Sequence, residues 1–160
     1  MVFRPQSPIR LSVPIIGQRD AGECLAACVA MVYAYFDIQT SYAQLLEALK
    51  IEKGIGAPFY QIRLLENAGI SVIYQDDGTL EELYELLVAG WPIIVSVDTR
   101  ELPYWQNVST RHVVVVVGMD RNNIYVNDPE FPNTTIKTSV GDFDLAWFAQ
   151  GEQYAVLAPS

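Results

Sequence analysis

One cysteine stands at the entrance of the most apolar helix that the sequence predicts. Cys24 follows Gln18 by six positions, and the run from Cys24 to Phe36 is apolar almost all round, as expected of a helix inside a core. The free N–H groups and the dipole at a helix N-terminus favour a thiolate. Cys24 is therefore a candidate nucleophile. Its own backbone N–H and the side-chain amide of Gln18 are candidate donors to an oxyanion.

The chain has a single histidine, so any mechanism that pairs a thiol with an imidazole must use His112. His112 lies where a long loop over residues 98–110 becomes a valine-rich strand. A turn near Asp120 or Arg121 brings the following strand back, so that Asp128 ends close to His112. A turn of odd length would put both side chains on one face of the hairpin. A carboxylate in that place would fix the tautomer of the imidazole.

Each of these residues also has a purely structural interpretation. Cysteine is among the most frequently buried residues, a lone histidine at a strand end is often only a hydrogen-bonded polar group, and Asp128 before Pro129 is a common strand terminator. Cys28, one turn deeper in the helix, is expected to be buried and inert. Four positions along a helix are too far apart for a disulfide between Cys24 and Cys28. Zinc bound by both cysteines and His112 would lack the CxxC spacing and a fourth ligand, so no metal is expected.

The elements that must hold these residues fall into two groups. After a short extended piece at 11–15, helices are predicted over 24–36, over a segment capped by Thr40 or Ser41 that runs through Leu49, and over 58–67. The rest reads as a strand at 70–74, a helix at 80–89 capped by Thr79, strands at 92–97, 113–117 and 124–128, then a strand at 134–138, a helix at 141–149 and a strand at 153–157. Helices first and antiparallel strands second indicate an α+β fold. We expect one domain over residues 1–160, with a helical half at about 15–69 and a β half at about 70–158.

The composition restricts the partners. A formal net charge of −9, from 19 acidic and 10 basic residues, argues against nucleic acid and anionic membrane surfaces. No apolar run approaches the length of a membrane span, and no secretory signal is visible. Two cysteines without such a signal suggest a reducing compartment, so the predicted location is cytoplasmic.

Taken together, these features resemble a known family. Gln18 and Cys24 before an apolar helix, His112 opening a strand that ends in Gly118, and Asn127-Asp128-Pro129 ending the next strand are similar to the papain-like bacteriocin-processing peptidases, and more closely to their stand-alone C39-like bacterial relatives. The resemblance runs from about Ile15 to Leu157 and keeps the chain order Gln, Cys, His, Asp.

The resemblance implies a papain-like fold with a cleft between its halves. It also implies that Cys24 is the nucleophile, His112 the general base and acid, Asp128 the residue that orients the imidazole, and Gln18 the oxyanion donor. The substrate would be a peptide or protein, with no cofactor and no attached transporter domain. Where transporter-attached members usually have Asp and Gly around the nucleophile, this chain has Glu23 and Leu25. Leu25 is expected to narrow the subsite beside the thiol.

Two other functions are compatible with the same residues. One is a peptide-binding domain that keeps the cleft without turnover, and the other is an acyltransferase that uses the same thioester. Two loops are candidates for the borders of the cleft. In the loop over 102–107, Trp105 would either cover a bound peptide or pack under its own loop. The loop over 54–59 would form the opposite rim.

Overall fold

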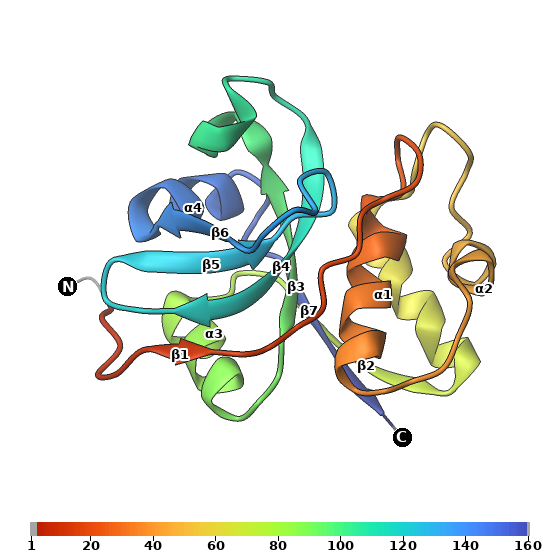
Figure 1. The fold of residues 1–160 in the computed structure, drawn as a ribbon, viewed down its shortest axis with the longest axis horizontal. Helices are drawn as coiled ribbons and strands as arrows, with labels where there is room; N and C mark the ends of the chain where they lie inside the picture. The colour runs from red at the N-terminus through yellow and green to blue at the C-terminus, as the bar shows by residue number, and fades with distance from the viewer. Residues whose placement is uncertain (1–2, 160) are drawn as a thin grey trace.

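The apolar run after Cys24 forms helix α1 (Cys24–Tyr35), the central helix of the fold (Figure 1). The computed structural model describes residues 3–159. Residues 25–29 and 31–33 of α1 are all buried, because the helix packs against neighbours on most of its surface, and Ala34 is exposed. Helix α2 (Tyr42–Ala48), the 3-10 helix η1 (Phe59–Ala68) and strand β4 (Arg111–Met119) surround it.

The strands form one antiparallel sheet, which within residues 3–159 has seven strands. Its order is β2-β7-β3-β4-β5-β6, and the short β1 pairs with the end of β4. The remaining strands are β1 (Ile9–Arg10), β2 (Ile70–Gln75), β3 (Ile93–Asp98), β5 (Asn123–Asn127), β6 (Ile136–Ser139) and β7 (Tyr154–Pro159). The expected α+β class is therefore confirmed.

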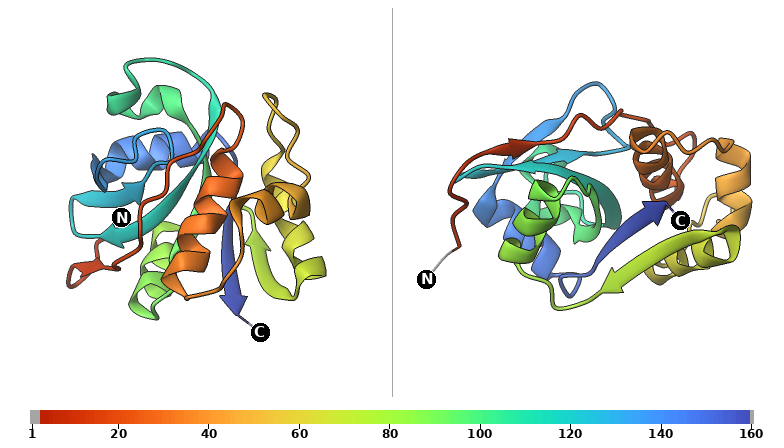
Figure 2. Two further views of the ribbon diagram at one scale, coloured as in Figure 1. Left: turned by 45° about the vertical axis from the view of Figure 1, so that its right-hand side comes forward. Right: turned by 90° about the horizontal axis from the view of Figure 1, so that it is seen from below.

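The sheet is covered on both faces, and alternate residues of β4 serve two separate cores. Val113, Val115 and Val117 pack with α1, α2 and η1, whereas Val114 and Val116 pack with α3 (Leu80–Val88) and α4 (Val140–Phe148). Figure 2 shows these two groups of helices on opposite sides of the sheet. Burial on both faces explains why this strand is a continuous run of valines.

Local signals in the sequence account for several element boundaries. Ser41 caps α2 by accepting a hydrogen bond from the Gln44 N–H, and Thr79 caps α3 by accepting from the Glu82 N–H, as predicted. The third helix differs from the prediction because it is wound as a 3-10 helix. Its buried residues Phe59, Ile62 and Leu65 recur every three positions, which matches the three residues per turn of this helix type.

The segments around the long loop differ from the prediction in detail. The first strand lies at Ile9–Arg10 rather than within the extended piece at 11–15. The loop after β3 contains two single-turn helices, η2 (Thr99–Glu101) and η3 (Pro103–Trp105). No helix within residues 3–159 has the length and apolar character that crossing a membrane requires.

Candidate active site

Cys24 is the first residue of α1, and Glu23 occupies the N-cap position. The N–H groups of a first helical turn have no acceptor within their own helix. Among the described residues, none accepts a hydrogen bond from the Cys24 amide. Cys24 is partly exposed and borders a cleft that His112 also lines. Cys24 therefore presents a thiol and a free N–H donor at the same opening.

A β-bulge brings Asp128 into phase with His112. At the tip of the β4–β5 hairpin Met119 pairs with Ile124, so the turn over 120–123 has even length. The register then shifts between Val116 and Gly118, and Val115 pairs with Asn127. This register, continued by one residue, puts Asp128 on the same face as His112. The turn lies where the sequence placed it but is not of the odd length that would produce this phase by itself, and the bulge produces the phase instead.

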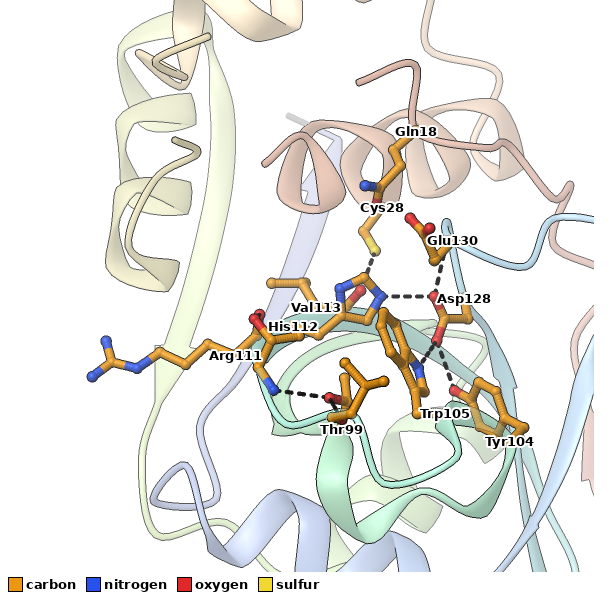
Figure 3. A network of polar contacts seen from close by, with 12 residues as sticks. Gln18, Cys28, Thr99, Tyr104, Trp105, Arg111, His112, Val113, Asp128 and Glu130 are labelled. Atoms are coloured by element: carbon orange, nitrogen blue, oxygen red, sulfur yellow. Dashed lines mark hydrogen bonds and ion pairs between the residues drawn. The ribbon is translucent and has the colours of Figure 1, made fainter. Parts of the chain in front are cut away.

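His112 lies between Asp128 and Cys24. Its Nε2 is 2.7 Å from Oδ1 of Asp128, and the two side chains are 5% and 0% exposed (Figure 3). Cys24 acts on the same ring and raises its pKa, so the thiol lies close to the imidazole. Since Nε2 is engaged by Asp128, Nδ1 is left for the thiol. Burial acts to lower the pKa of His112, but the bond to Asp128 and the neighbouring Cys24 outweigh it and raise the pKa to about 9.

Asp128 is buried and receives four hydrogen bonds. In addition to His112, Oδ1 accepts from the backbone N–H of Glu130 at 2.9 Å. Oδ2 accepts from the Tyr104 hydroxyl at 2.7 Å and from Nε1–H of Trp105 at 3.0 Å. Burial alone would raise the pKa of this carboxyl, but the bond to His112, the positive charge on its ring and the other donors lower it. The arrangement holds Asp128 as a carboxylate.

Gln18 lies on the loop before α1 and lines the same cleft as Cys24 and His112. Its backbone N–H donates to the carbonyl of Pro129 at 3.0 Å, which ties this loop to the segment that carries Asp128. Its side-chain Nε2 donates one hydrogen to the Asp20 carbonyl at 3.3 Å. An amide nitrogen carries two hydrogens, so the second is available to a ligand in the cleft.

Cys28 is fully buried one turn below Cys24, as predicted. Its Sγ–H donates to the carbonyl of Val113 at 3.3 Å. Burial, together with the nearby groups Cys24 and Asp128, raises the pKa of this thiol well above its usual range. Among residues 3–159, no group of three or more His, Cys, Asp or Glu side chains could hold a metal ion.

The cleft has a volume of about 1140 Å³ and borders on both parts of the fold. The loop between α2 and η1 supplies one wall and the sheet with its loops supplies the other. The residues involved are Ile55, Gly56, Ala57 and Pro58 of that loop, with Phe59 and Tyr60 at the start of η1, and Ser96, Trp105, Thr110, Arg111 and Gln153 of the sheet and its loops. Both loops expected at the borders therefore contribute to it.

Leu25 and Trp105 differ in their position relative to the cleft. Leu25 is 1% exposed and belongs to the core around α1, so it does not narrow the cleft beside Cys24. The prediction was wrong because residue 25 points inward from the first turn of the helix. Trp105 borders the cleft, and its ring lies edge-on to His112 at a centroid distance of 4.8 Å.

Two residues of the site were not assigned a role from the sequence. Glu23 is only 5% exposed, and its Oε1 accepts from the Tyr42 hydroxyl at 2.9 Å and from the Asp20 N–H at 3.3 Å. Tyr104 donates to Asp128 across 24 positions of the chain. Both depend on tertiary contacts, so neither leaves a local pattern that a sequence reader could have used.

The sequence profile of the C39-like peptidase family matches residues 10–155. A comparison with curated protein sequences found no significant match.

Several solved structures share the fold. A protein described as a C39-like peptidase from Bacillus anthracis is 19% identical with a TM-score of 0.77, covering 97% of this chain and 99% of that one. A double-glycine-motif protease from an AMS/PCAT transporter, solved in complex with the leader peptide, is 24% identical with a TM-score of 0.69, covering 98% and 100%. A Carica candamarcensis cysteine protease in complex with E-64 is 14% identical with a TM-score of 0.64, also covering 98% and 100%. The fold is papain-like.

Proposed function

This chain belongs to the C39-like peptidase family, and from that premise we propose that it hydrolyses peptide bonds with Cys24 as the nucleophile. His112 is the general base and acid in this proposal, and Asp128 orients its ring. The observation that carries the proposal is the position of the chain's single imidazole, which hydrogen-bonds to a buried carboxylate and borders the same cleft as the Cys24 thiol.

The electrostatics of the site support an ion pair between thiolate and imidazolium. The pKa of His112 is raised to about 9, so its ring holds a proton at neutral pH. An imidazolium beside Cys24, together with the N-terminal end of the α1 dipole, stabilises negative charge on sulfur. Asp128 stabilises the imidazolium in turn, and because it accepts from Nε2–H it leaves Nδ1–H facing the thiolate.

Hydrolysis then proceeds in two halves. The Cys24 thiolate attacks the peptide carbonyl carbon, a C–S bond forms, and the carbonyl π electrons move to oxygen. His112 donates its proton to the leaving nitrogen as the C–N bond breaks, which gives a thioester and a free amine. Water attacks the thioester while neutral His112 takes its proton. Collapse of the second tetrahedral intermediate releases the carboxylic acid and restores the thiolate.

Both tetrahedral intermediates carry a negative oxygen that needs donors. The Cys24 backbone N–H and the free hydrogen of Gln18 Nε2 border the cleft beside the thiol and fit this task. Every group that this reaction uses is a side chain or backbone amide of the chain itself, so the proposal requires no cofactor.

The proposed substrate is an extended peptide segment. Around the thiol, the cleft is lined by residues with little or no side chain, namely Ala21, Gly22, Gly56 and Ala57, which lets a peptide backbone approach Cys24 closely. The relative from the AMS/PCAT transporter holds a leader peptide in its crystal structure. Which peptide this chain cleaves is a question for a library of synthetic peptides.

We also propose that residues 1–160 act as one domain located in the cytoplasm. The packing of α1 against β4 in a shared core supports a single folding unit. Both cysteines are free thiols, which fits a reducing compartment.

Thiol alkylation tests the proposed function most directly. Iodoacetamide treatment at pH 5 to 9, followed by peptide mapping, is expected to modify Cys24 well below pH 8 and to leave Cys28 unmodified. The variant His112→Ala should slow the reaction of Cys24 at acidic and neutral pH. A Cys24 that reacts as slowly as an ordinary free thiol, with or without His112, would contradict the proposal.

Product analysis separates hydrolysis from the two rival functions. The protein is incubated with the peptide library with and without an added amine, and the products are identified by mass spectrometry. Carboxylic acid products that require Cys24 support hydrolysis. Amide products formed in preference to acids would indicate an acyltransferase, and binding without any product would indicate a peptide-binding domain.

A further inference from the structure

Two aromatic residues hold the oxygen of Asp128 that does not face His112. The Tyr104 hydroxyl donates to Oδ2 at 2.7 Å and the Trp105 indole N–H donates to it at 3.0 Å (Figure 3). Both donors come from η3, a single turn in the loop that leads into β4. The reaction steps proposed above do not use either residue.

The loop that carries these donors is closed at its base. Thr99 is fully buried, its N–H donates to the Thr110 carbonyl at 3.0 Å, and its hydroxyl accepts from the Thr110 N–H at 3.0 Å. The same hydroxyl donates to the Val108 carbonyl. Since Thr110 is two residues before His112, the closure fixes the loop relative to the imidazole.

The rings around Asp128 pack as a cluster. Tyr104 and Trp105 each meet the Phe131 ring edge-on at a centroid distance of 5.3 Å, and Trp105 also lies against His112. Such contacts limit the movement of both aromatic rings. The two donors are therefore held in place independently of Asp128.

We propose that Tyr104 and Trp105 are positioning residues, which hold the Asp128 carboxylate in the rotation that directs Oδ1 at Nε2 of His112. This inference rests on the proposed function, in which the orientation of His112 matters. Removing a donor leaves Oδ2 in a buried site short of a partner, and the carboxylate then gains freedom to rotate or to bind a proton.

The titratable groups that act on Asp128 come from three elements. His112 approaches from β4, Tyr104 from η3, and Cys28 from α1, while Cys24 acts through His112. Glu130, on the segment after Asp128, is exposed. It bonds to Asp128 through its backbone N–H and not through its carboxylate. Because burial raises the pKa of Asp128 and the donors lower it, the loss of a donor makes Asp128 easier to protonate.

Single-hydrogen-bond variants test the proposal with a matched control. Tyr104→Phe and Trp105→Phe each remove one donor and keep an aromatic ring. Tyr125→Phe is the control, because Tyr125 donates to Oδ2 of Asp120 at 2.6 Å, which is the same kind of bond at the turn of the hairpin. Thermal unfolding identifies the variants that fold. If only one of Tyr104→Phe and Trp105→Phe folds, that variant is compared with Tyr125→Phe.

We expect kcat to fall about 10-fold in Tyr104→Phe, the value of one hydrogen bond to a charged group, with KM unchanged because Tyr104 does not line the cleft. In a plot of kcat against pH, the acid limb of Tyr104→Phe should move to higher pH. The control should keep the parent kcat and profile. Equal kcat and equal acid limbs in the η3 variants and the control would overturn the proposal.

A spectroscopic measurement distinguishes this inference from the function on which it rests. The chain has one histidine, so the Nε2–H proton that bonds to Asp128 gives one imidazole resonance to follow. Its chemical shift should move in Tyr104→Phe and Trp105→Phe and stay in place in Tyr125→Phe. A moved resonance in a protein that cleaves no peptide would refute the proposed function alone. A resonance that stays in place in an active protein would refute the positioning role alone.

Discussion

Gly22 and Gly56 meet backbone to backbone beside the candidate nucleophile. A Cβ atom on Gly22 would lie 2.7 Å from the Gly56 nitrogen, and a Cβ atom on Gly56 would lie 2.8 Å from the Gly22 carbonyl oxygen. Both residues have positive φ, +83° and +95°. The contact joins the segment that leads into Cys24 to the loop between α2 and η1, so the position of this wall of the cleft depends on two residues without side chains.

Gly56→Ala should therefore destabilise the protein more than Gly54→Ala. Gly54 has a similar positive φ of +77°, but a Cβ atom there would meet nothing within 4 Å. Both variants carry the backbone strain, about 1 kcal/mol, and only Gly56→Ala adds a clash worth about 1–3 kcal/mol. Urea unfolding measures the difference. Equal losses of stability in the two variants would refute the role of the close contact.

Much of the fold and the candidate site could be predicted because their signals are local. The apolar helix after Cys24, the valine run after His112 and the caps at Ser41 and Thr79 each depend on residues a few positions apart. The presence of one histidine also left no choice of imidazole. These features required no knowledge of tertiary packing.

The features that could not be predicted depend on residues distant in the sequence. The bulge between Val116 and Gly118 allows a hairpin with an even turn to bring Asp128 into phase with His112, and a count of turn residues cannot reveal it. The inward direction of Leu25 depends on how α1 sits in its core. The bond from Tyr104 to Asp128 requires a loop and a strand end to meet.

The stability of the protein should fall as pH rises from about 6.5 to 9. An unfolded chain binds the proton of His112 with an ordinary pKa near 6.5, whereas the folded pKa is about 9. The stabilisation is therefore complete below pH 6.5 and is lost as pH rises through 9, on the order of 3 kcal/mol in total.

Asp128→Asn provides the comparison for this pH dependence. Without the carboxylate, the folded pKa of His112 should drop and the slope of stability between pH 6.5 and 9 should become shallow. Urea unfolding at several pH values measures the slope, and proton NMR of the single imidazole measures the pKa. A parent protein whose imidazole titrates near 6.5 would show that the ion pair contributes nothing.

Cys28 should behave as an unreactive core residue. In the variant Cys24→Ala it is the only thiol of the chain, and burial with its raised pKa should prevent reaction with iodoacetamide at pH 8. The same variant should react fully in urea, and Cys28→Ser, which keeps a donor to the Val113 carbonyl, should retain the parent activity. Alkylation of Cys28 in the folded protein would indicate that α1 opens.

The side chain of Gln18 should matter for kcat more than for KM. Gln18→Ala removes the proposed side-chain donor to the oxyanion and keeps the backbone bond to Pro129, so kcat should fall about 10²–10³-fold. Gln153→Ala is the control, because Gln153 also lines the cleft but follows α4 in the β part of the fold. Steady-state kinetics on one peptide compare the variants, and similar effects at both positions would count against an oxyanion role.

Removing the hydroxyl of Tyr42 should destabilise the protein, because this hydroxyl donates to the buried carboxylate of Glu23. Tyr42→Phe removes the 2.9 Å bond to Oε1 and leaves the 3.3 Å bond from the Asp20 N–H, which should cost about 1.5–3 kcal/mol of unfolding free energy. The pKa of Tyr42 is itself raised, first by burial and then by this bond.

Tyr35→Phe is the matched control for this contact. Tyr35 is the last residue of α1, the helix that Glu23 caps at its other end. It donates at 2.9 Å to the uncharged carbonyl of Gly90, so the loss of this bond should cost about 1 kcal/mol. Glu23 is the N-cap residue directly before Cys24, and Tyr42→Phe should also slow the alkylation of Cys24 while Tyr35→Phe leaves it unchanged. If the two variants lose equal stability and alkylate at equal rates, the bond from Tyr42 does not position Glu23. The backbone of the preceding loop alone then holds the N-terminus of α1.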